Sequence, residues 1–372
     1  MKILFVLEYY YPHIGGVETF FQKLAEGLAQ QNFSVTILTA RIKNAPSVET
    51  INQVKINRIW VPIWLNRYWF TLLSFFNLLG KARQFDLIHT TTYNAALPAW
   101  LIAKIFRKKV VITVHEILGP LWFKLPEMNK FSATLHYWFE KIIIRLPFDQ
   151  SIAVSDYTKQ CLLQNQVAAK KIQRIYHGID YQLFDYKKKS SLLTKQTMGL
   201  GDNFSYLFFG RPGWIKGLNY LIQAWPSVLK QVPQAKLILL ISKEPALPYQ
   251  ALLKLIAKLQ IDKNVLILNS VTRDKLPQYL QVADCVVIPS LSEGFGFSAA
   301  EAAAMEVPLV VSAVGSLPEV VSGKVIFSPP QNSQALAQAL INAALQKYKI
   351  IPKKKFEWSA AIKAYIKLYQ TL

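Results

Sequence analysis

Short apolar runs alternate with helix-length segments along most of the chain, and this alternation restricts the possible folds more than any other feature. Strands are predicted in the first half at residues 2–7, 34–39, 86–89, 110–114 and 151–154. In the second half they are predicted at 206–209, 236–241, 265–268, 285–288, 309–312 and 325–327. Helical patterns such as 17–30 and 217–230 lie between them. Strands that alternate with helices form right-handed βαβ units and parallel sheets covered on both faces. We therefore predict an α/β protein.

The alternation lapses between Gly178 and Ser205, in a polar stretch that includes residues 187–191 and the glycines at 199 and 201. A chain of 372 residues is long enough for about two domains with separate cores. We predict two doubly wound domains, residues 1–180 and 181–355, and a C-terminal helix at about 356–372 that packs back on the first domain. Ligands of such sheets bind at the carboxyl ends of the strands, so a cleft between two facing domains is the expected site.

The chain carries 43 Lys and Arg against 22 Asp and Glu, a formal net charge of +21, which indicates an anionic partner. Residues 1–180 contribute +10 and the remainder +11, so no basic tail accounts for the excess. Zinc-finger, RNP and P-loop patterns are missing from the sequence, and we expect no nucleic-acid partner. The only two cysteines, Cys161 and Cys285, lie far apart, which excludes a disulfide scaffold and a Cys-based zinc site and fits a reducing compartment.

The apolar run at the start of the chain ends at Glu8, which is too soon for a signal peptide, and it predicts a strand.

Two segments of the chain combine aromatic and basic residues. Segment 59–80 contains a single charge, Arg67, but its uninterrupted part, 68–80, is too short for the roughly 20 apolar residues that span a bilayer. It holds Trp60, Trp64, Tyr68, Trp69, Phe70, Phe75 and Phe76, and segment 122–145 has a similar composition. Amphipathic rings with cations suit a helix lying in a lipid headgroup layer, and an aromatic-rich core is the alternative.

Two glycine-rich turns follow the first strand of each half. Gly15 and Gly16 let the backbone approach a ligand, and the helix behind them offers N–H donors to an anion; a turn with an ordinary helix cap is the alternative. The second turn runs from Gly210 to Gly217 and adds Arg211 and Lys216. A guanidinium and an ammonium beside such a turn suit a diphosphate, although two surface cations have the same pattern.

The most specific pattern begins at Glu293 and continues through Gly294, Phe295 and Gly296 to Glu301. The glycines expose backbone N–H groups at a predicted helix N-terminus, where an anion is stabilised. Two carboxylates eight residues apart can bind vicinal hydroxyls. The alternative is a capping box formed by Ser298 and Glu301, which accounts for Glu301 but not for Glu293 or the two glycines.

These motifs together resemble the retaining GT-B-fold glycosyltransferases of family 4, the group 1 glycosyltransferases, over nearly the whole chain. The segment Tyr176-His177-Gly178-Ile179-Asp180 looks like the interdomain NGVD segment of that family, with His at the Asn position. Gly315-Ser316-Leu317-Pro318-Glu319 looks like its GGxPE turn, with Ser at the second Gly. His115 matches a further family pattern, followed here by Glu116 instead of the usual Asp.

The resemblance implies two doubly wound Rossmann-like domains, the first for the acceptor and the second for the donor. Arg211 and Lys216 would neutralise the donor diphosphate behind Gly210, and Gly15 and Gly16 would lie against the phosphates. The amides of Gly294, Phe295 and Gly296 would hold the diphosphate and the sugar. Glu301 would bind the ribose, Glu293 the donor sugar, and His115 would approach the transferred sugar. The implied catalytic residues are His115, Arg211, Lys216 and Glu293.

The implied activity is retaining hexosyl transfer from a UDP- or GDP-sugar to a lipid-linked or glycan acceptor in cell-envelope polysaccharide or glycolipid synthesis. The chain has no Asp-x-Asp motif, so we expect neither a metal nor another cofactor. A non-catalytic sugar-nucleotide or membrane-surface binding module and a GT-B-fold epimerase are the alternatives. Because the active site needs few of the positive charges, we expect a cytoplasmic enzyme peripherally bound to the anionic inner face of the cell membrane.

Overall fold

The computed structural model describes residues 1–13, 15–188 and 193–372, which form two compact units. The first unit comprises Met1–Gly178 together with Phe356–Leu372, and the second comprises Ile179–Lys355. The sequence placed the boundary between residues 180 and 181, two residues further along. Of the polar connector at 187–191, residues 189–191 lie outside the described part of the chain.

The first unit is built on a mixed sheet whose strand order, over the described residues, is β3-β4-β2-β1-β5-β6-β7-β8. Neighbouring strands run parallel except β3 and β4, which are antiparallel. The strands are β1 (Lys2–Val6), β2 (Ser34–Ala40), β3 (Val48–Ile51), β4 (Val54–Ile59), β5 (Leu87–Thr91), β6 (Lys109–Val114), β7 (Gln150–Ala153) and β8 (Ile172–Arg174). The helices are α1 (Gly16–Gln30), α2 (Asn66–Leu79), α3 (Ala96–Ile105), α4 (Lys130–Arg145), α5 (Asp156–Gln164) and the C-terminal α12 (Trp358–Thr371).

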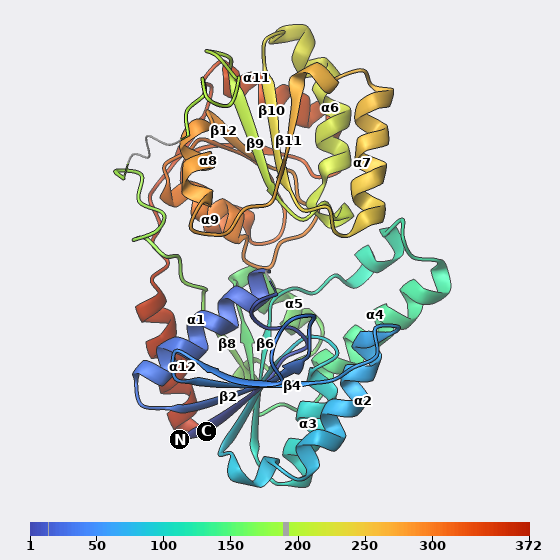
Figure 1. Cartoon of the computed structure of the whole chain (residues 1–372), viewed down its shortest axis with the longest axis vertical. Helices are drawn as coiled ribbons and strands as arrows, with labels where there is room; N and C mark the ends of the chain where they lie inside the picture. Colours follow the sequence, from blue (N-terminus) through green and yellow to red (C-terminus); the bar gives the residue numbers. More distant parts are fainter. Residues whose placement is uncertain (14, 189–192) are drawn as a thin grey trace. The chain divides into compact units, whose positions relative to one another are not determined.

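Helices cover both faces of this sheet (Figure 1). On one face, α1 and α12 pack over β1 and β5, where Phe5 contacts Phe21 and the buried His89 hydrogen bonds to Tyr369. The apolar side chains of α2, α3, α4 and α5 form a separate core on the other face. Gly178 packs so tightly on α12 that a Cβ there would lie 2.4 Å from the Trp358 ring. The last helix is therefore an integral part of the first unit.

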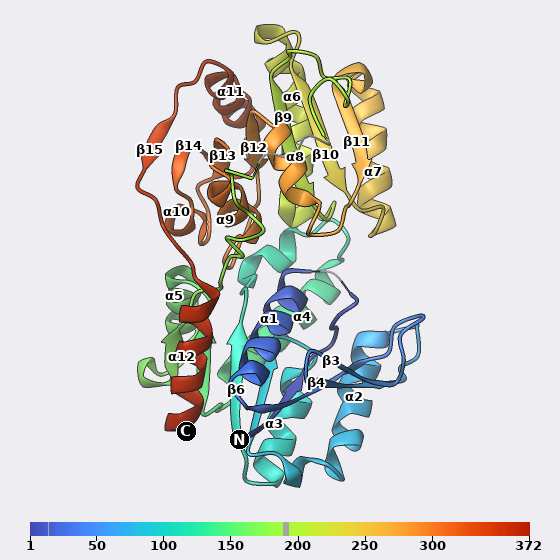
Figure 2. The ribbon, with the colours of Figure 1, turned by 60° about the vertical axis from the view of Figure 1, so that its left-hand side comes forward.

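The second unit repeats the architecture with the strand order β11-β10-β9-β12-β13-β14-β15 across its described residues (Figure 2). These strands are parallel except β15, which pairs antiparallel with β14. They are β9 (Ser205–Gly210), β10 (Lys236–Ile241), β11 (Val265–Asn269), β12 (Cys285–Ile288), β13 (Leu309–Ser312), β14 (Gly323–Ser328) and β15 (Lys349–Ile351). The helices are α6 (Leu218–Gln231), α7 (Ala246–Lys258), α8 (Leu276–Val282), α9 (Phe297–Ala304), α10 (Leu317–Val320) and α11 (Ser333–Ala344). The side chains of α6, α7 and α11 form the core on one face.

The structure confirms the predicted α/β architecture and corrects it at the edges of both sheets. Every predicted strand is present, and the bounds of β10, β12 and β13 agree with the sequence to the residue. The predicted parallel pairing holds throughout except at two edge strands, since β3 and β15 run antiparallel to their neighbours. These edge strands are only four and three residues long and are largely exposed, so they lack the continuous apolar run by which a buried strand is identified.

Candidate functional site

The predicted donor residues of the second unit follow neighbouring strands at their carboxyl ends. Lys216 follows β9, Glu293 follows β12, and Gly315 follows β13. Parallel strands bring these loops to one edge of the sheet, where doubly wound proteins bind their ligands. Residues nearly 100 positions apart in the sequence therefore share one place in the fold.

Lys216 and Glu293 form the centre of this group. The ammonium Nζ of Lys216 lies 2.6 Å from Oε1 of Glu293, and the hydroxyl of Ser290 donates to the same oxygen at 2.8 Å. The Glu293 side chain is only 11% exposed, whereas that of Lys216 is 37% exposed. The cation predicted for the diphosphate and the carboxylate predicted for the sugar are thus adjacent, so one nucleotide sugar can contact both.

Two glycines hold the backbone around Glu293. Gly217 has φ +70°, and a Cβ there would lie 1.8 Å from the carbonyl oxygen of Pro289. Gly315 has φ +59°, and its Cβ would lie 2.3 Å from the carbonyl oxygen of Glu293. Only glycine adopts this conformation at so close an approach without strain. The loops after β9 and β13 therefore both rest on the loop after β12, and the turn that begins at Gly315 supports Glu293.

Glu301 lies on α9 and pairs with a residue that the sequence reasoning missed. Its carboxylate accepts a hydrogen bond from Nη2 of Arg273, which stands in the loop between β11 and α8. Glu301 is 5% exposed, and burial raises its pKa while Arg273 opposes the shift. The alternative of a capping box is wrong: α9 begins after Gly296 as its N-cap, so Glu301 lies beyond the first turn. Arg273 lies in none of the sequence motifs, so its contact with Glu301 could not be predicted from the sequence.

The remaining predicted donor residues surround this centre. Gly210 is the last residue of β9, and Arg211 follows it with an exposed side chain. Gly294, Phe295 and Gly296 form the loop that leads into α9. The Phe295 ring is buried and packs edge-on against the Phe297 ring. Within the described contacts, Arg211 is not paired with either glutamate, unlike Lys216 and Arg273.

The glycine turn of the first unit leads directly into α1. Gly15 is the N-cap residue in an extended conformation, and Gly16 is the first residue of the helix. Glu18 lies in the first turn of α1, and its Oε1 is 2.8 Å from Nδ1 of His13. The carboxylate therefore has a side-chain partner as well as a favourable position at the helix N-terminus. The turn therefore lies in the connection between β1 and α1.

His115 follows β6 and forms a pair with His177. Nδ1 of His115 lies 3.2 Å from Nε2 of His177, and both rings pack against Phe20. Burial lowers the pKa of His115 from 6.5 to about 3, so the ring is neutral at ordinary pH. Its other ring nitrogen, Nε2, is buried without a partner among the described residues. The sequence did not predict that His177 pairs with His115. The only indication was that His177 occupies the position where the family that the chain resembles has Asn.

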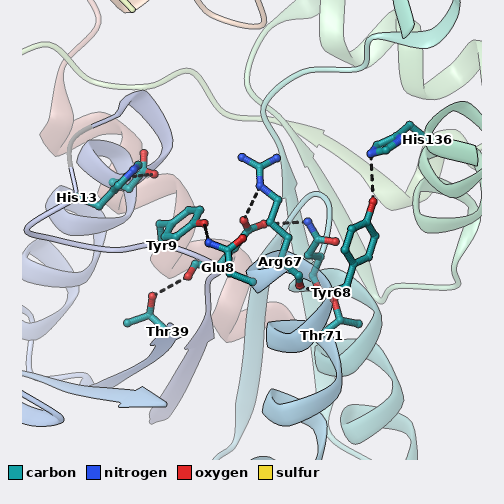
Figure 3. Close-up of polar contacts among 11 residues, drawn as sticks. Glu8, Tyr9, His13, Thr39, Arg67, Tyr68, Thr71 and His136 are labelled. Atoms are coloured by element: carbon teal, nitrogen blue, oxygen red, sulfur yellow. Dashed lines mark hydrogen bonds and ion pairs between the residues drawn. The ribbon is translucent and has the colours of Figure 1, made fainter. Parts of the chain in front are cut away.

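A second cluster that the sequence did not single out lies at the carboxyl ends of β1 and β5 (Figure 3). The Glu8 carboxylate accepts a hydrogen bond from Nδ2 of Asn94 at 2.9 Å, and its other oxygen lies 3.1 Å from Nε of Arg67. Tyr9 accepts a hydrogen bond from Asn66 at 2.8 Å. In the sequence Glu8 was notable only as the residue that ends the first apolar run.

The two aromatic-basic segments expose many large apolar side chains on α2, on α4 and in the segment before α2. Most of their large side chains face solvent, so the alternative of an aromatic-rich core is wrong for most of them. We call this set the α2–α4 surface: Trp60, Trp64, Tyr68, Trp69, Leu72, Phe76, Phe131, Leu135, Trp138 and Ile142. The hydroxyl of Tyr68 lies 3.4 Å from Nε2 of His136 and links the two helices.

Other members of these segments pack inward. Phe70 is fully buried, Phe75 and Phe139 pack on the core, and the Trp122 indole donates to Glu140 at 3.1 Å. In the part of the chain that the structure describes, no helix combines the length and the hydropathy needed to cross a bilayer.

Comparison with known proteins agrees with this geometry in both units. The family described as Glycosyltransferase Family 4 matches residues 14–183, and Glycosyl transferases group 1 matches residues 203–345. The chain is a family 4, group 1 glycosyltransferase. The two matches fall on the two Rossmann-like units, so the family assignment and the fold agree along the chain.

Relatives of this glycosyltransferase extend over its full length. An uncharacterized glycosyltransferase of Methanocaldococcus jannaschii is 28% identical across 100% of the chain and 98% of the relative. The phosphatidylinositol N-acetylglucosaminyltransferase GPI3 subunit of Saccharomyces cerevisiae is 22% identical across 99% of the chain and 79% of its own length. The crystal structure of Anabaena HepE in complex with UDP-glucose superposes with a TM-score of 0.74 at 20% identity, covering 100% of both chains. The fold of this glycosyltransferase is therefore GT-B.

Proposed function

We propose that this glycosyltransferase moves a hexose from a UDP- or GDP-sugar to a hydroxyl of a lipid-linked or glycan acceptor, with retention at the anomeric carbon. The observation that carries the proposal is the contact between Lys216 and Glu293, 2.6 Å apart in loops held together by Gly217 and Gly315. A cation for the leaving diphosphate and a carboxylate for the sugar hydroxyls are what this transfer needs in one place.

The chemistry follows from where charge develops. When the anomeric C–O bond breaks, its electron pair stays on the nucleoside diphosphate, and the sugar becomes oxocarbenium-like. Lys216 and Arg211 stabilise the diphosphate, together with the backbone N–H groups of Gly294 to Gly296. The acceptor oxygen then forms the new bond on the same face, and its proton passes to the departing phosphate oxygen. These charges come from the chain itself, and we propose that transfer proceeds without a metal or other cofactor.

His115 supplies a neutral hydrogen-bonding group from the first unit. Since burial lowers its pKa to about 3, it is not a general acid at neutral pH. Its Nδ1 is engaged by His177, and Nε2 has no partner among the described residues. We propose that Nε2 hydrogen bonds to a hydroxyl of the transferred sugar, where a neutral imidazole orients the ring without adding charge.

We propose that Glu301 binds the ribose with support from Arg273. Arg273 occupies one carboxylate oxygen and so fixes the rotamer of a side chain that is 5% exposed. Solved HepE carries UDP-glucose, which favours a nucleotide-sugar donor for a chain of the same fold. The GPI3 relative acts on phosphatidylinositol by its name, which favours an acceptor attached to a lipid.

We further propose that the enzyme works at the anionic inner face of the cell membrane, in the synthesis of envelope polysaccharide or glycolipid. The support is the α2–α4 surface, where Trp64 is 75% and Phe131 74% exposed. Exposed Lys124, Lys130 and Arg145 accompany these apolar side chains. Aromatic rings beside cations are the composition of interfacial helices.

The test is a panel of nucleotide sugars scored by release of the nucleoside diphosphate. Lys216→Met should reduce release by at least a hundredfold with the best donor, because the leaving group loses its charge-assisted contact. Lys230→Met is the matched control: it removes the same charge from an exposed position on α6 and should leave release unchanged. Wild-type release by Lys216→Met refutes the site. Nucleotide binding without release by the wild type favours the binding-module alternative, and interconversion of the donor sugar favours an epimerase.

A further inference from the structure

Glu8, Asn94 and Arg67 form a polar cluster that the proposed donor chemistry does not use. They come from three separate elements: Glu8 follows β1, Asn94 follows β5, and Arg67 lies in the first turn of α2. Asn94 is 9% exposed, and its amide donates to one oxygen of Glu8. The Thr71 hydroxyl donates to the backbone carbonyl of Asn94 at 2.9 Å, which holds the Asn94 backbone against α2. The chain thus holds a carboxylate firmly at the ligand-binding edge of the first sheet.

Burial makes this carboxylate unfavourable as a purely structural element. The Glu8 side chain is 16% exposed, and desolvation raises its pKa despite the opposing effects of Arg67 and Asn94. Its ion pair with Arg67, whose side chain is 65% exposed, contributes little net stability to offset that cost. A partly buried, well-oriented carboxylate at a strand end is typical of a binding group.

Arg67 is oriented to bind more than Glu8. Only its Nε faces the carboxylate, at 3.1 Å, and the side chain is 65% exposed. The terminal amino groups of the guanidinium point away from Glu8 in Figure 3. A guanidinium offers five N–H donors in a planar fork that matches the oxygens of a phosphate. Arg67 can therefore keep its contact with Glu8 while it binds an anion.

The cluster is continuous with the α2–α4 surface. Arg67 is followed by Tyr68 and Trp69, which are 54% and 37% exposed. Tyr68 reaches His136 on α4, so apolar and aromatic groups begin directly beside the guanidinium. On the other side, β1, β5 and β6 are neighbours in the sheet, which places Glu8 and His115 at the same edge. A ligand here would contact the apolar surface with one end and the sheet edge with the other.

We propose that Glu8, Asn94 and Arg67 bind the polar head of the acceptor, a phosphate ester with neighbouring hydroxyls. Arg67 binds the phosphate, and Glu8, oriented by Asn94, accepts a hydrogen bond from a hydroxyl. The apolar part of a lipid acceptor continues onto the α2–α4 surface. This inference rests on the proposed function, since it assigns the second substrate of the same reaction.

The experiment measures binding to the full chain with probes of defined chemistry. Titration calorimetry compares glycerol 1-phosphate, inorganic phosphate and glycerol. Co-sedimentation compares vesicles of phosphatidylcholine that contain or lack phosphatidylglycerol, whose head group carries a phosphate and two hydroxyls. The variants are Arg67→Gln, Arg67→Lys and Glu8→Gln, each checked for an unchanged unfolding transition. Lys81→Gln is the control, because it removes the same charge from an exposed position just beyond the other end of α2.

Arg67→Gln should weaken binding of glycerol 1-phosphate at least tenfold, and Arg67→Lys should recover part of the loss. In the wild type glycerol 1-phosphate should bind more tightly than inorganic phosphate, and Glu8→Gln should abolish this difference in affinity. Lys81→Gln should have the affinities of the wild type. Binding of the vesicles identifies a lipid head group, whereas binding of the soluble ester alone identifies a soluble phosphate ester as acceptor. Wild-type affinity in Arg67→Gln, an equal loss in Lys81→Gln, or no binding of any phosphate ester by the wild type overturns the proposal.

Donor turnover separates this outcome from failure of the proposed function. Hydrolysis of the nucleotide sugar by the wild type in the absence of acceptor measures the donor site alone, and Lys81→Gln should match it. If no nucleotide sugar is bound or turned over by any variant, the proposed function fails whatever the phosphate ester does.

Discussion

Replacing Gly315 by Ala should displace Glu293 and so reduce transfer. The added Cβ would lie 2.3 Å from the Glu293 carbonyl oxygen, and the two atoms must separate by about 0.7 Å to reach 3.0 Å, the closest approach that side chains tolerate. That oxygen accepts hydrogen bonds from the backbone N–H and the hydroxyl of Ser316, at 3.0 and 3.2 Å. Weakening both costs about 1–2 kcal/mol, in addition to about 1 kcal/mol for a non-glycine residue at φ +59°.

The effect on activity should exceed the effect on stability. A displacement approaching 1 Å at a catalytic group lowers turnover by up to about a hundredfold. Gly323→Ala is the matched control, since Gly323 has φ +81° and open space where its Cβ would lie. It should lose about 1 kcal/mol and keep its turnover. Urea unfolding and release of nucleoside diphosphate measure the two quantities. Equal losses of stability and turnover in the two variants would refute the role of Gly315 as the support of Glu293.

Two further predictions concern the first unit. Burial lowers the pKa of His89 to about 3, so its contribution to stability is complete above pH 6.5 and decreases as the pH falls, by about 2 kcal/mol at pH 5. His89→Gln should reduce the loss between pH 8 and pH 5 by that amount in urea unfolding; an unchanged pH dependence contradicts it. Phe76→Ser should weaken co-sedimentation with anionic vesicles several-fold, whereas Leu345→Ser, at 57% exposure against 59%, should not. Equal binding by both variants rules out contact through α2.

The strands of the two sheets could be read from the sequence because their side chains are apolar on both faces. The strands β10, β12 and β13 lie between helices, and burial leaves a continuous run of Val, Ile and Leu at each. The edge strand β3 and its neighbour β4 mix polar and apolar side chains, so their sequences resemble a loop. Their turn at Asn52 and Gln53 adopts positive φ without the glycine that marks such turns.

The contacts at the site depend on tertiary structure, which local patterns do not contain. Lys216 and Glu293 were both selected by their motifs, and the order of β9 and β12 in the sheet brings them together. Arg273 belongs to no sequence motif. It is identified only by its hydrogen bond to the buried carboxylate of Glu301 on α9, which the tertiary structure creates. The spacing of Ser298 and Glu301 is an example of a local pattern that allows two interpretations. The structure excludes the capping box, because the N-cap of α9 is Gly296, in a left-handed conformation, and not Ser298.

The two glycine contacts explain how the proposed donor site can be rigid although it is built from loops. Loops at strand ends are free to vary, and a site made only of loops would have to be ordered by its substrate. Here Gly217 lies against Pro289 and Gly315 against Glu293, so loops from three strands share one backbone junction. Lys216 precedes the first of these glycines, and its ammonium is therefore fixed relative to Glu293 by backbone packing as well as by charge. Electrostatic stabilisation of a leaving group is strongest when the charges need no reorganisation during the reaction. For the proposed transfer, backbone packing at the two glycines therefore holds the Lys216–Glu293 pair in the arrangement in which its charges act.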